Sequence, residues 1–291
     1  MKKLFVLAVA AVMMLTGAAA LAEFNPSNDI AVVSREEGSG TRGAFIELTG
    51  ILTKDAEGKE MDNTTLEADF VNGTSLVMTT VGQNEYAIGY ASLASVEGND
   101  TVKALKVGGV VPSTEDILNG SYAVARPFNV VTKGELTDEV AKDFMAYILS
   151  KEGQEVVSAN GLVPVSNDTT PSYEAKNLSG KITVGGSTSV APVMEKLIEA
   201  YKALNANVEI DLQSTGSSAG VTNALNGTYT IGMASRALKD SEIADGAAGT
   251  VLAMDGIAII VNPANPIEDI ELEQVRQIFV GEVTSWDALS K

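Results

Sequence analysis

The stretch KITVGGSTS, residues 181–189, decides the fold, because a run typical of a β-strand ends there in two glycines and three hydroxyl residues. The residues that follow, 191–204, have the spacing of an amphipathic helix. Its apolar stripe consists of Val193, Leu197, Tyr201 and Leu204. A strand, a glycine-rich turn and a helix in this order indicate an α/β unit, in which the carboxyl end of the strand meets the amino end of the helix.

Two more places in the chain have the same form. The predicted strand 208–212 is followed by GSSAG at 216–220, and the predicted strand 29–33 is followed by REEGSGTR at 35–42. A helix is predicted after each of them. Further strands are predicted at 87–91, 128–132 and 257–262, and the helices at 43–52, 138–150, 219–226 and 272–279. Strands that alternate with helices predict an α/β protein with mainly parallel sheets flanked by helices.

The three glycine-rich junctions are candidate anion sites. The first N–H groups of a helix have no partner within the helix, and the helix dipole places partial positive charge there. Glycine lets the backbone approach a ligand closely, and serine and threonine add uncharged donors. Any single junction is better explained as a plain helix N-cap. Three of them together with Arg35 predict convergence on one small anion at the carboxyl ends of the strands.

The composition excludes many enzyme classes. The 291 residues include no histidine and no cysteine, which rules out a Ser-His-Asp triad, a Cys-His pair and a zinc site with nitrogen or sulfur ligands. No stretch matches the nucleotide phosphate loop, the dinucleotide fingerprint or a calcium loop. The formal net charge of −18 argues against nucleic acid and anionic membranes as partners. We expect a binding protein without metal or cofactor, although catalysis by carboxylates alone stays open.

Residues 1–22 predict a secretory signal peptide, because Lys2 and Lys3 precede an apolar run and small residues end at Ala22. The mature chain would begin at Glu23. Because no cysteine is present to carry a lipid, we expect a soluble, secreted protein in the periplasm or at the exterior of the cell envelope. The remaining length suggests two domains. The Ser-, Asn- and Pro-rich segment 166–179 is typical of a linker.

Four motifs resemble those of the periplasmic phosphate-binding protein of the high-affinity phosphate ABC transporter. They are GSTS at 186–189, GSSAG at 216–220, IGMASR at 231–236 and SREEGSGTR at 34–42. The likeness covers nearly all of the mature chain, including DGIAIIVNP at 255–263, 272–286, Gly89 with Tyr90, and 126–128. It implies a two-lobed periplasmic-binding-protein fold of class II with the ligand in the cleft. It also implies a non-enzymatic monomer that captures inorganic phosphate and delivers it to the membrane permease of the transporter.

Other functions remain alternatives at this point. Sulfate or molybdate is the main competitor, since only the family likeness favours phosphate over them. A phosphatase or other hydrolase would show turnover, which the missing histidine and cysteine disfavour. A scaffold or adhesin would bind no small ligand, which the three Gly, Ser and Thr junctions disfavour.

The order of the motifs is reversed relative to the family, which usually begins with the GSTS strand and carries the GSGT element in its second half. The resemblance therefore implies a circularly permuted chain, in which segment 166–179 joins the original ends. Termini of compact domains often lie close together, so a fold can survive such a change. The lobes implied are 23–126 with 255–291, and 127–254 including the linker. The crossovers near Arg126 and Asp255 are the candidate hinges.

The resemblance also implies a set of phosphate contacts: Arg35, Ser39, Gly40, Thr41, Thr188, Ser189, Ser217 and Ser235. Arg35 would form a bidentate, charge-assisted pair with two phosphate oxygens, while Glu37 would orient its guanidinium. The serine and threonine residues would donate hydroxyl or backbone N–H hydrogen bonds.

Selectivity depends on an acceptor for the proton that phosphate carries and sulfate lacks. Ser235 stands where many family members have an aspartate that can accept this proton. A buried acceptor disfavours sulfate because two lone pairs that face each other are costly. Asp255 and Glu36 are the candidate substitutes, although Asp255 is equally well explained as a turn residue ahead of Gly256.

Overall fold

The computed structural model describes residues 24–290, so the predicted signal peptide at 1–22 lies outside the described residues. The strands are β1 (Ala31–Arg35), β2 (Leu52–Lys54), β3 (Glu60–Asp62), β4 (Asp69–Val71), β5 (Ala87–Ser92), β6 (Lys103–Ala104), β7 (Lys106–Val107), β8 (Ala125–Lys133), β9 (Val163–Pro164), β10 (Gly180–Gly186), β11 (Val208–Ser214), β12 (Ile231–Ala234), β13 (Ala247–Val261) and β14 (Asp269–Ile270). The helices are α1 (Gly40–Leu48), α2 (Thr74–Gly82), α3 (Leu93–Val96), α4 (Thr114–Leu118), α5 (Glu139–Ile148), α6 (Lys151–Ala159), α7 (Ala191–Leu204), α8 (Ser217–Leu225), α9 (Asp240–Ala244), α10 (Leu272–Phe279) and the 3-10 helix η1 (Trp286–Ser290). None of these helices, which cover the described part of the chain, is long and apolar enough to cross a membrane.

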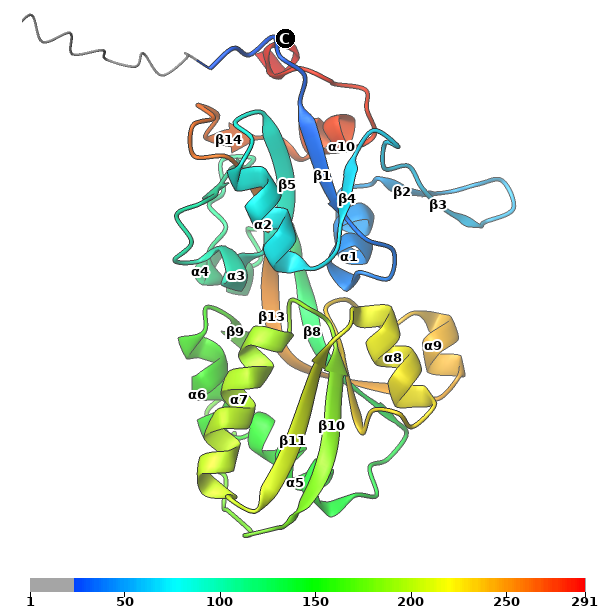
Figure 1. The fold of residues 1–291 in the computed structure, drawn as a ribbon, viewed down its shortest axis with the longest axis vertical. Helices are drawn as coiled ribbons and strands as arrows, with labels where there is room; N and C mark the ends of the chain where they lie inside the picture. The colour runs from blue at the N-terminus through cyan, green and yellow to red at the C-terminus, as the bar shows by residue number, and fades with distance from the viewer. Residues whose placement is uncertain (1–23, 291) are drawn as a thin grey trace, which may run out of the picture.

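One long mixed sheet organises the molecule (Figure 1). Its strands follow the order β11-β10-β12-β8-β13-β5-β1-β4, and β6 and β9 also pair with β13. At one end β10 is parallel to β11 and β12, and at the other end β1 is parallel to β4 and β5. The long strands β8 and β13 between them are antiparallel to each other and to their neighbours. The predicted α/β class is confirmed, but parallel pairing is confined to the outer strands because β8 and β13 cross in opposite directions.

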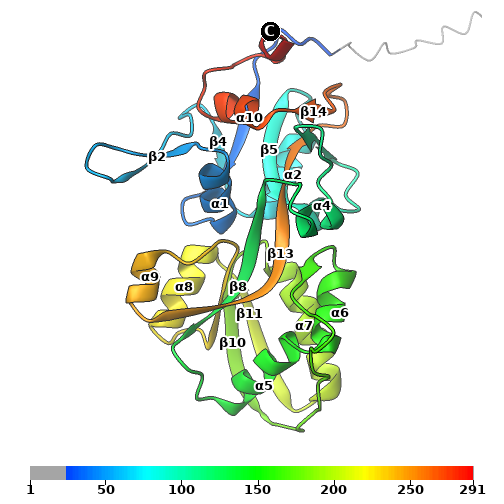
Figure 2. The same cartoon turned by 180° about the vertical axis from the view of Figure 1, so that it is seen from behind.

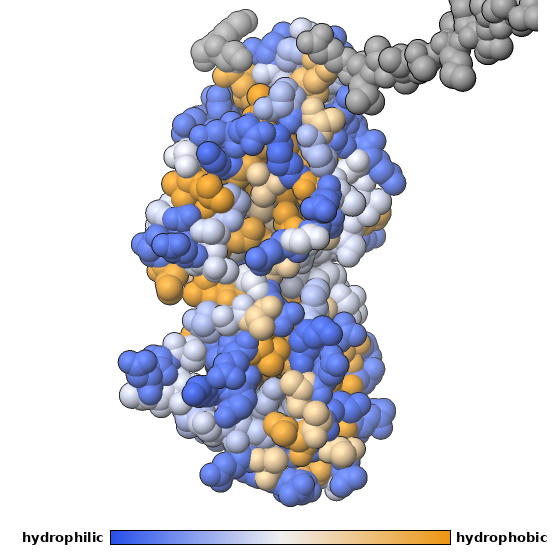
Figure 3. Space-filling model, turned by 90° about the vertical axis from the view of Figure 1, so that its left-hand side faces the viewer, coloured by the Kyte–Doolittle hydropathy of each residue, from blue (hydrophilic) through white to orange (hydrophobic). Residues whose placement is uncertain are grey.

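Two large hydrophobic cores make the molecule two-lobed, and a smaller third cluster lies under α8 in the second lobe. The first core is built from residues 24–125 and 254–289, together with Val163. The second is built from residues 128–253, together with Ala94. Strands β8 and β13 contribute to both cores and run through both lobes (Figure 2). The surface narrows between the lobes (Figure 3), so these two strands form the main connection across the waist.

Most predicted elements differ from the structure by a few residues at their ends, and two differ more. The helix predicted at 43–52 is α1, which begins at Gly40 because the Ser39 side chain caps it by accepting the N–H of Arg42. The strand predicted at 257–262 is the end of β13, which begins at Ala247. The first half of β13 is held by its pairing with β8, and such long-range pairing leaves a weaker signal in the local sequence than a buried apolar run.

The two ends of the described chain lie side by side (Figure 1), where Asp29 forms a β-bridge with Ser285. Segment 166–179 is irregular, as predicted for a linker. It packs on the second lobe, where the Tyr173 hydroxyl donates a hydrogen bond to Asp143 at 2.6 Å. Neighbouring termini and a surface linker are compatible with a different order of the same segments along the chain.

Candidate anion-binding site

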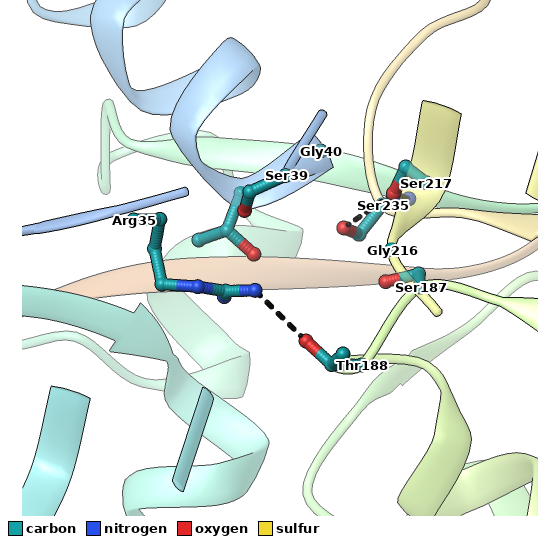
Figure 4. Close-up of a pocket in the computed structure, with 9 residues that line it drawn as sticks. Arg35, Ser39, Gly40, Ser187, Thr188, Gly216, Ser217 and Ser235 are labelled. Carbon is teal, nitrogen blue, oxygen red and sulfur yellow. Dashed lines mark hydrogen bonds between the residues drawn. The ribbon is translucent and has the colours of Figure 1, made fainter. Parts of the chain in front are cut away.

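The three predicted junctions, β1 to α1, β10 to α7 and β11 to α8, meet between the lobes around a small, closely lined pocket (Figure 4). The pocket is lined by Arg35, Ser39, Gly40, Thr41, Ser187, Thr188, Gly216, Ser217 and Ser235. Seven of the eight residues predicted as contacts therefore lie together. The eighth, Ser189, stands behind the lining, and its Oγ is 2.9 Å from Oγ1 of Thr41.

Arg35 is the one charged residue among the nine that line the pocket, and it is 1% exposed. Its Nη2 donates to Oγ1 of Thr188 across the cleft at 2.9 Å (Figure 4). Its Nη1 lies 3.4 Å from Oγ1 of Thr74. The edge of the guanidinium formed by Nη1 and Nη2 thus faces hydroxyl groups, and it is the edge available for a bidentate contact with an oxyanion.

The carboxylate that orients Arg35 is Glu36, and the prediction of Glu37 was wrong. Nε and Nη2 of Arg35 donate to the two carboxylate oxygens of Glu36 at 2.7 and 2.8 Å, whereas Glu37 is exposed. Glu36 also accepts the N–H of Gly73 at 3.2 Å. Burial disfavours the charged carboxylate, but the hydrogen bonds and charge of Arg35 outweigh it, so the pKa of Glu36 lies below its ordinary value. Glu36 does not line the pocket and is already occupied as an acceptor.

Gly40 allows the two lobes to approach each other closely. A Cβ atom at this position would lie 2.8 Å from Cβ of Ser217 and 2.8 Å from Oγ of Ser235, both in the opposite lobe. Close to Gly40, the N–H of Ser218 in one lobe donates a hydrogen bond to the carbonyl oxygen of Gly38 in the other lobe at 3.1 Å. The absence of a side chain at Gly40 is therefore a condition for the closed arrangement.

Two lining residues, Ser187 and Gly216, were not predicted. The Ser187 hydroxyl accepts the N–H groups of Ser189 and Val190, each at 3.3 Å, so it caps the turn that leads into α7. Gly216 has a φ of 93° and precedes α8. Both lie inside the glycine- and serine-rich stretches identified in the sequence. The sequence pattern therefore located these stretches, but it did not indicate which of their residues line the pocket.

Thr74, at the start of α2, was also missed. Its Oγ1 lies 3.1 Å from Oγ1 of Thr188 and 3.0 Å from Oγ of Ser189. The sequence NGTS at 72–75, directly after β4, has the same form as the other junctions. A search for a strand followed by glycine and hydroxyl residues would have found it.

Asp255 is neither a turn residue nor a group that lines the pocket. It lies within β13 and forms an ion pair at 3.0 Å with Arg126 of β8, with both side chains at most 1% exposed. It also accepts from the Ser92 hydroxyl at 3.0 Å. Burial raises the pKa of Asp255, and the charge of Arg126 opposes this rise. Arg126 in turn donates to the carbonyl oxygen of Ser235 at 3.0 Å, so the pair supports the pocket from behind.

Replacing Asp255 with asparagine should lower the free energy of unfolding by about 3 kcal/mol or more, because Arg126 would keep its buried charge without a counter-ion. The ratio of phosphate to sulfate affinity should not change, since Asp255 does not line the pocket. Urea unfolding measures the first quantity and calorimetric titration the second. The control is Glu268→Gln, which removes an exposed carboxylate from its pair with Lys103. If Asp255→Asn lowers the free energy of unfolding no more than this control does, Asp255 does not act as the buried counter-ion of Arg126.

Comparisons with known proteins agree with this architecture. The sequence model of the PBP superfamily domain matches residues 18–152 and 171–291. The chain is 47% identical to phosphate-binding protein PstS 2 of Streptococcus agalactiae, over 100% of this chain and 99% of the relative. It is 30% identical to PstS of Bacillus subtilis, but over 47% of this chain and 42% of that relative. A crystal structure described as the phosphate-binding protein of a phosphate ABC transporter from Streptococcus pneumoniae is similar with a TM-score of 0.72 and 44% identity, covering 90% of this chain and 100% of that one. The chain therefore belongs to the PstS family of phosphate-binding proteins within the PBP superfamily.

Proposed function

We propose that this protein captures inorganic phosphate outside the cytoplasmic membrane and delivers it to the permease of an ABC importer. The observation that carries the proposal is the pocket between the lobes, in which buried Arg35 faces hydroxyl groups and the amino ends of helices α1 and α8. Its nine lining residues include no carboxylate. Such a site favours a small oxyanion because it offers one cation and many donors.

The names of the relatives support phosphate as the ligand and transport as the role. Capture and release need no catalysis, so we infer a binding protein that is not an enzyme. The same role requires export, for which residues 1–22 would serve as the signal peptide. The eight predicted contacts are retained in this proposal, with Ser189 acting behind the lining through Thr41.

We further infer that the chain order is a circular permutation of the order found in other PstS proteins. The relative from Streptococcus agalactiae matches over 100% of the chain, whereas PstS of Bacillus subtilis matches less than half of it. Under this proposal the lobes are 23–126 with 255–291, and 127–254. They would close about the crossing point of β8 and β13, where Arg126 pairs with Asp255.

Isothermal titration of the ligand-stripped protein with phosphate, and separately with sulfate, tests the proposed function. We expect one phosphate to bind per chain and sulfate to bind far more weakly. Equal binding of the two anions would indicate a general site for tetrahedral oxyanions such as sulfate or molybdate. If neither anion binds, the transport proposal fails and a scaffold becomes the better explanation.

A further inference from the structure

Four hydroxyl groups form a continuous chain beside the pocket. Oγ1 of Thr41 lies 2.9 Å from Oγ of Ser189, which lies 3.0 Å from Oγ1 of Thr74, which lies 3.1 Å from Oγ1 of Thr188. This hydroxyl chain crosses the cleft, because Thr41 and Thr74 belong to α1 and α2 of one lobe while the other two residues precede α7 in the other lobe. Both ends of the hydroxyl chain, Thr41 and Thr188, line the pocket, whereas the two middle residues do not.

Counting protons along this chain restricts what its ends can do. Four hydroxyl groups have four protons, and the three hydrogen bonds between them use three. The one proton left over can stay on Thr41 or on Thr188, or on a residue between them. At most one end can therefore donate into the pocket, and at least one end presents a lone pair.

Arg35 cannot change this count, because a guanidinium has no acceptor. Its Nη2 donates to Thr188 at 2.9 Å and its Nη1 lies 3.4 Å from Thr74. Each of these hydroxyl oxygens has two lone pairs, so the contacts with Arg35 are compatible with both directions of the chain. The arginine adds positive charge, and at least one end of the hydroxyl chain still presents a lone pair.

Two other lining hydroxyls can donate to the ligand. Oγ of Ser39 accepts the N–H of Arg42, and Oγ of Ser187 accepts the N–H groups of Ser189 and Val190, all at 3.3 Å. Their own protons are therefore free for the ligand. In the remaining lining pair, Oγ of Ser217 and Oγ of Ser235 lie 3.3 Å apart, so their hydrogen bond is long and weak. The four-residue hydroxyl chain has shorter contacts of 2.9 to 3.1 Å and therefore holds a lone pair toward the ligand more firmly.

We propose that the hydroxyl chain of Thr41, Ser189, Thr74 and Thr188 selects a protonated oxyanion, with one end donating to the ligand and the other accepting its O–H. This inference rests on the proposed function and specifies how the same site discriminates. Inorganic phosphate has at least one proton at neutral pH, and sulfate has none. A sulfate oxygen would meet the lone pair of one chain end, and such a contact between two acceptors is costly.

Thr74→Val tests the proposal, because it removes the hydroxyl in the middle of the chain and keeps the shape of the side chain. Thr188 and Thr41 can then both donate, so sulfate no longer meets a lone pair. We expect the ratio of sulfate to phosphate dissociation constants at neutral pH to fall about tenfold or more. The control is Thr74→Ser, which keeps the hydroxyl and should keep the ratio.

Ser189→Ala cuts the chain at its other inner position and should lower the ratio in the same way, so the test does not depend on one variant folding well. Thermal unfolding of each variant verifies that it is folded. If the wild-type protein prefers phosphate and both folded variants keep the wild-type ratio, the hydroxyl-chain proposal is overturned. The proposed function stays intact in that case. Wild-type protein that binds both anions equally would also overturn it. Wild-type protein that binds neither anion would instead remove the proposed function itself.

Discussion

Replacing Arg35 with alanine should weaken phosphate binding by about 30- to 4,000-fold. Truncating one partner of a buried, hydrogen-bonded charge pair costs about 2–5 kcal/mol, and each 1.4 kcal/mol is about a tenfold change in affinity. Arg35 is the sole cation of the pocket lining and is 1% exposed, so water cannot replace it easily. Calorimetric titration with phosphate measures the loss.

Two further variants separate the geometry of Arg35 from its charge. Arg35→Lys keeps the charge but loses the planar fork, and we expect an affinity between those of wild type and Arg35→Ala. Arg276→Ala removes the same charge from an exposed network with Glu273 and Glu282, so it should bind phosphate as the wild type does. An Arg35→Ala protein that binds no worse than Arg276→Ala would contradict the assigned site.

Replacing Gly40 with alanine should weaken phosphate binding by about 5- to 150-fold, the equivalent of an overpacking cost of about 1–3 kcal/mol. The new Cβ would lie 2.8 Å from atoms of Ser217 and Ser235 in the opposite lobe. The lobes can avoid this clash by staying apart, so the free energy of unfolding should change little. Small-angle scattering with phosphate present should show a larger radius of gyration than for the wild type.

Gly43→Ala is the matched control for this change. It adds the same methyl group to α1, but the nearest atom is Cδ of Arg236 at 3.3 Å, at a position where a flexible side chain can shift. We expect its phosphate affinity to stay close to that of the wild type. If Gly40→Ala closes on phosphate with unchanged affinity, the close approach of the lobes at Gly40 is not required for binding.

Features encoded by neighbouring residues were predictable from the sequence. The glycine, serine and threonine stretches that end β10 and β11 identified the helix starts, and residues 35–42 supplied the arginine and the third junction. Seven of the eight proposed contacts line one pocket because parallel strands place their carboxyl ends together within each lobe, and the two lobes point these ends toward each other.

Features that depend on pairing between distant segments were not predictable. The partner of Asp255 is Arg126, 129 residues away, and only the register of β8 against β13 brings them together. Likewise Thr74 reaches the site through a contact with Thr188 that spans 114 residues. The choice between Glu36 and Glu37 as the partner of Arg35 depends on the direction of each side chain after the strand ends, which composition does not specify.

A crystal structure of the protein grown with phosphate tests the central claim most directly. We predict one tetrahedral anion in the pocket between the lobes, with Nη1 and Nη2 of Arg35 and the hydroxyl groups of Ser39 and Thr188 within hydrogen-bond distance. In the same crystal structure the two lobes should be closed, with Gly40 in contact with Ser217. Phosphate bound elsewhere, with no anion between the lobes, would contradict the account.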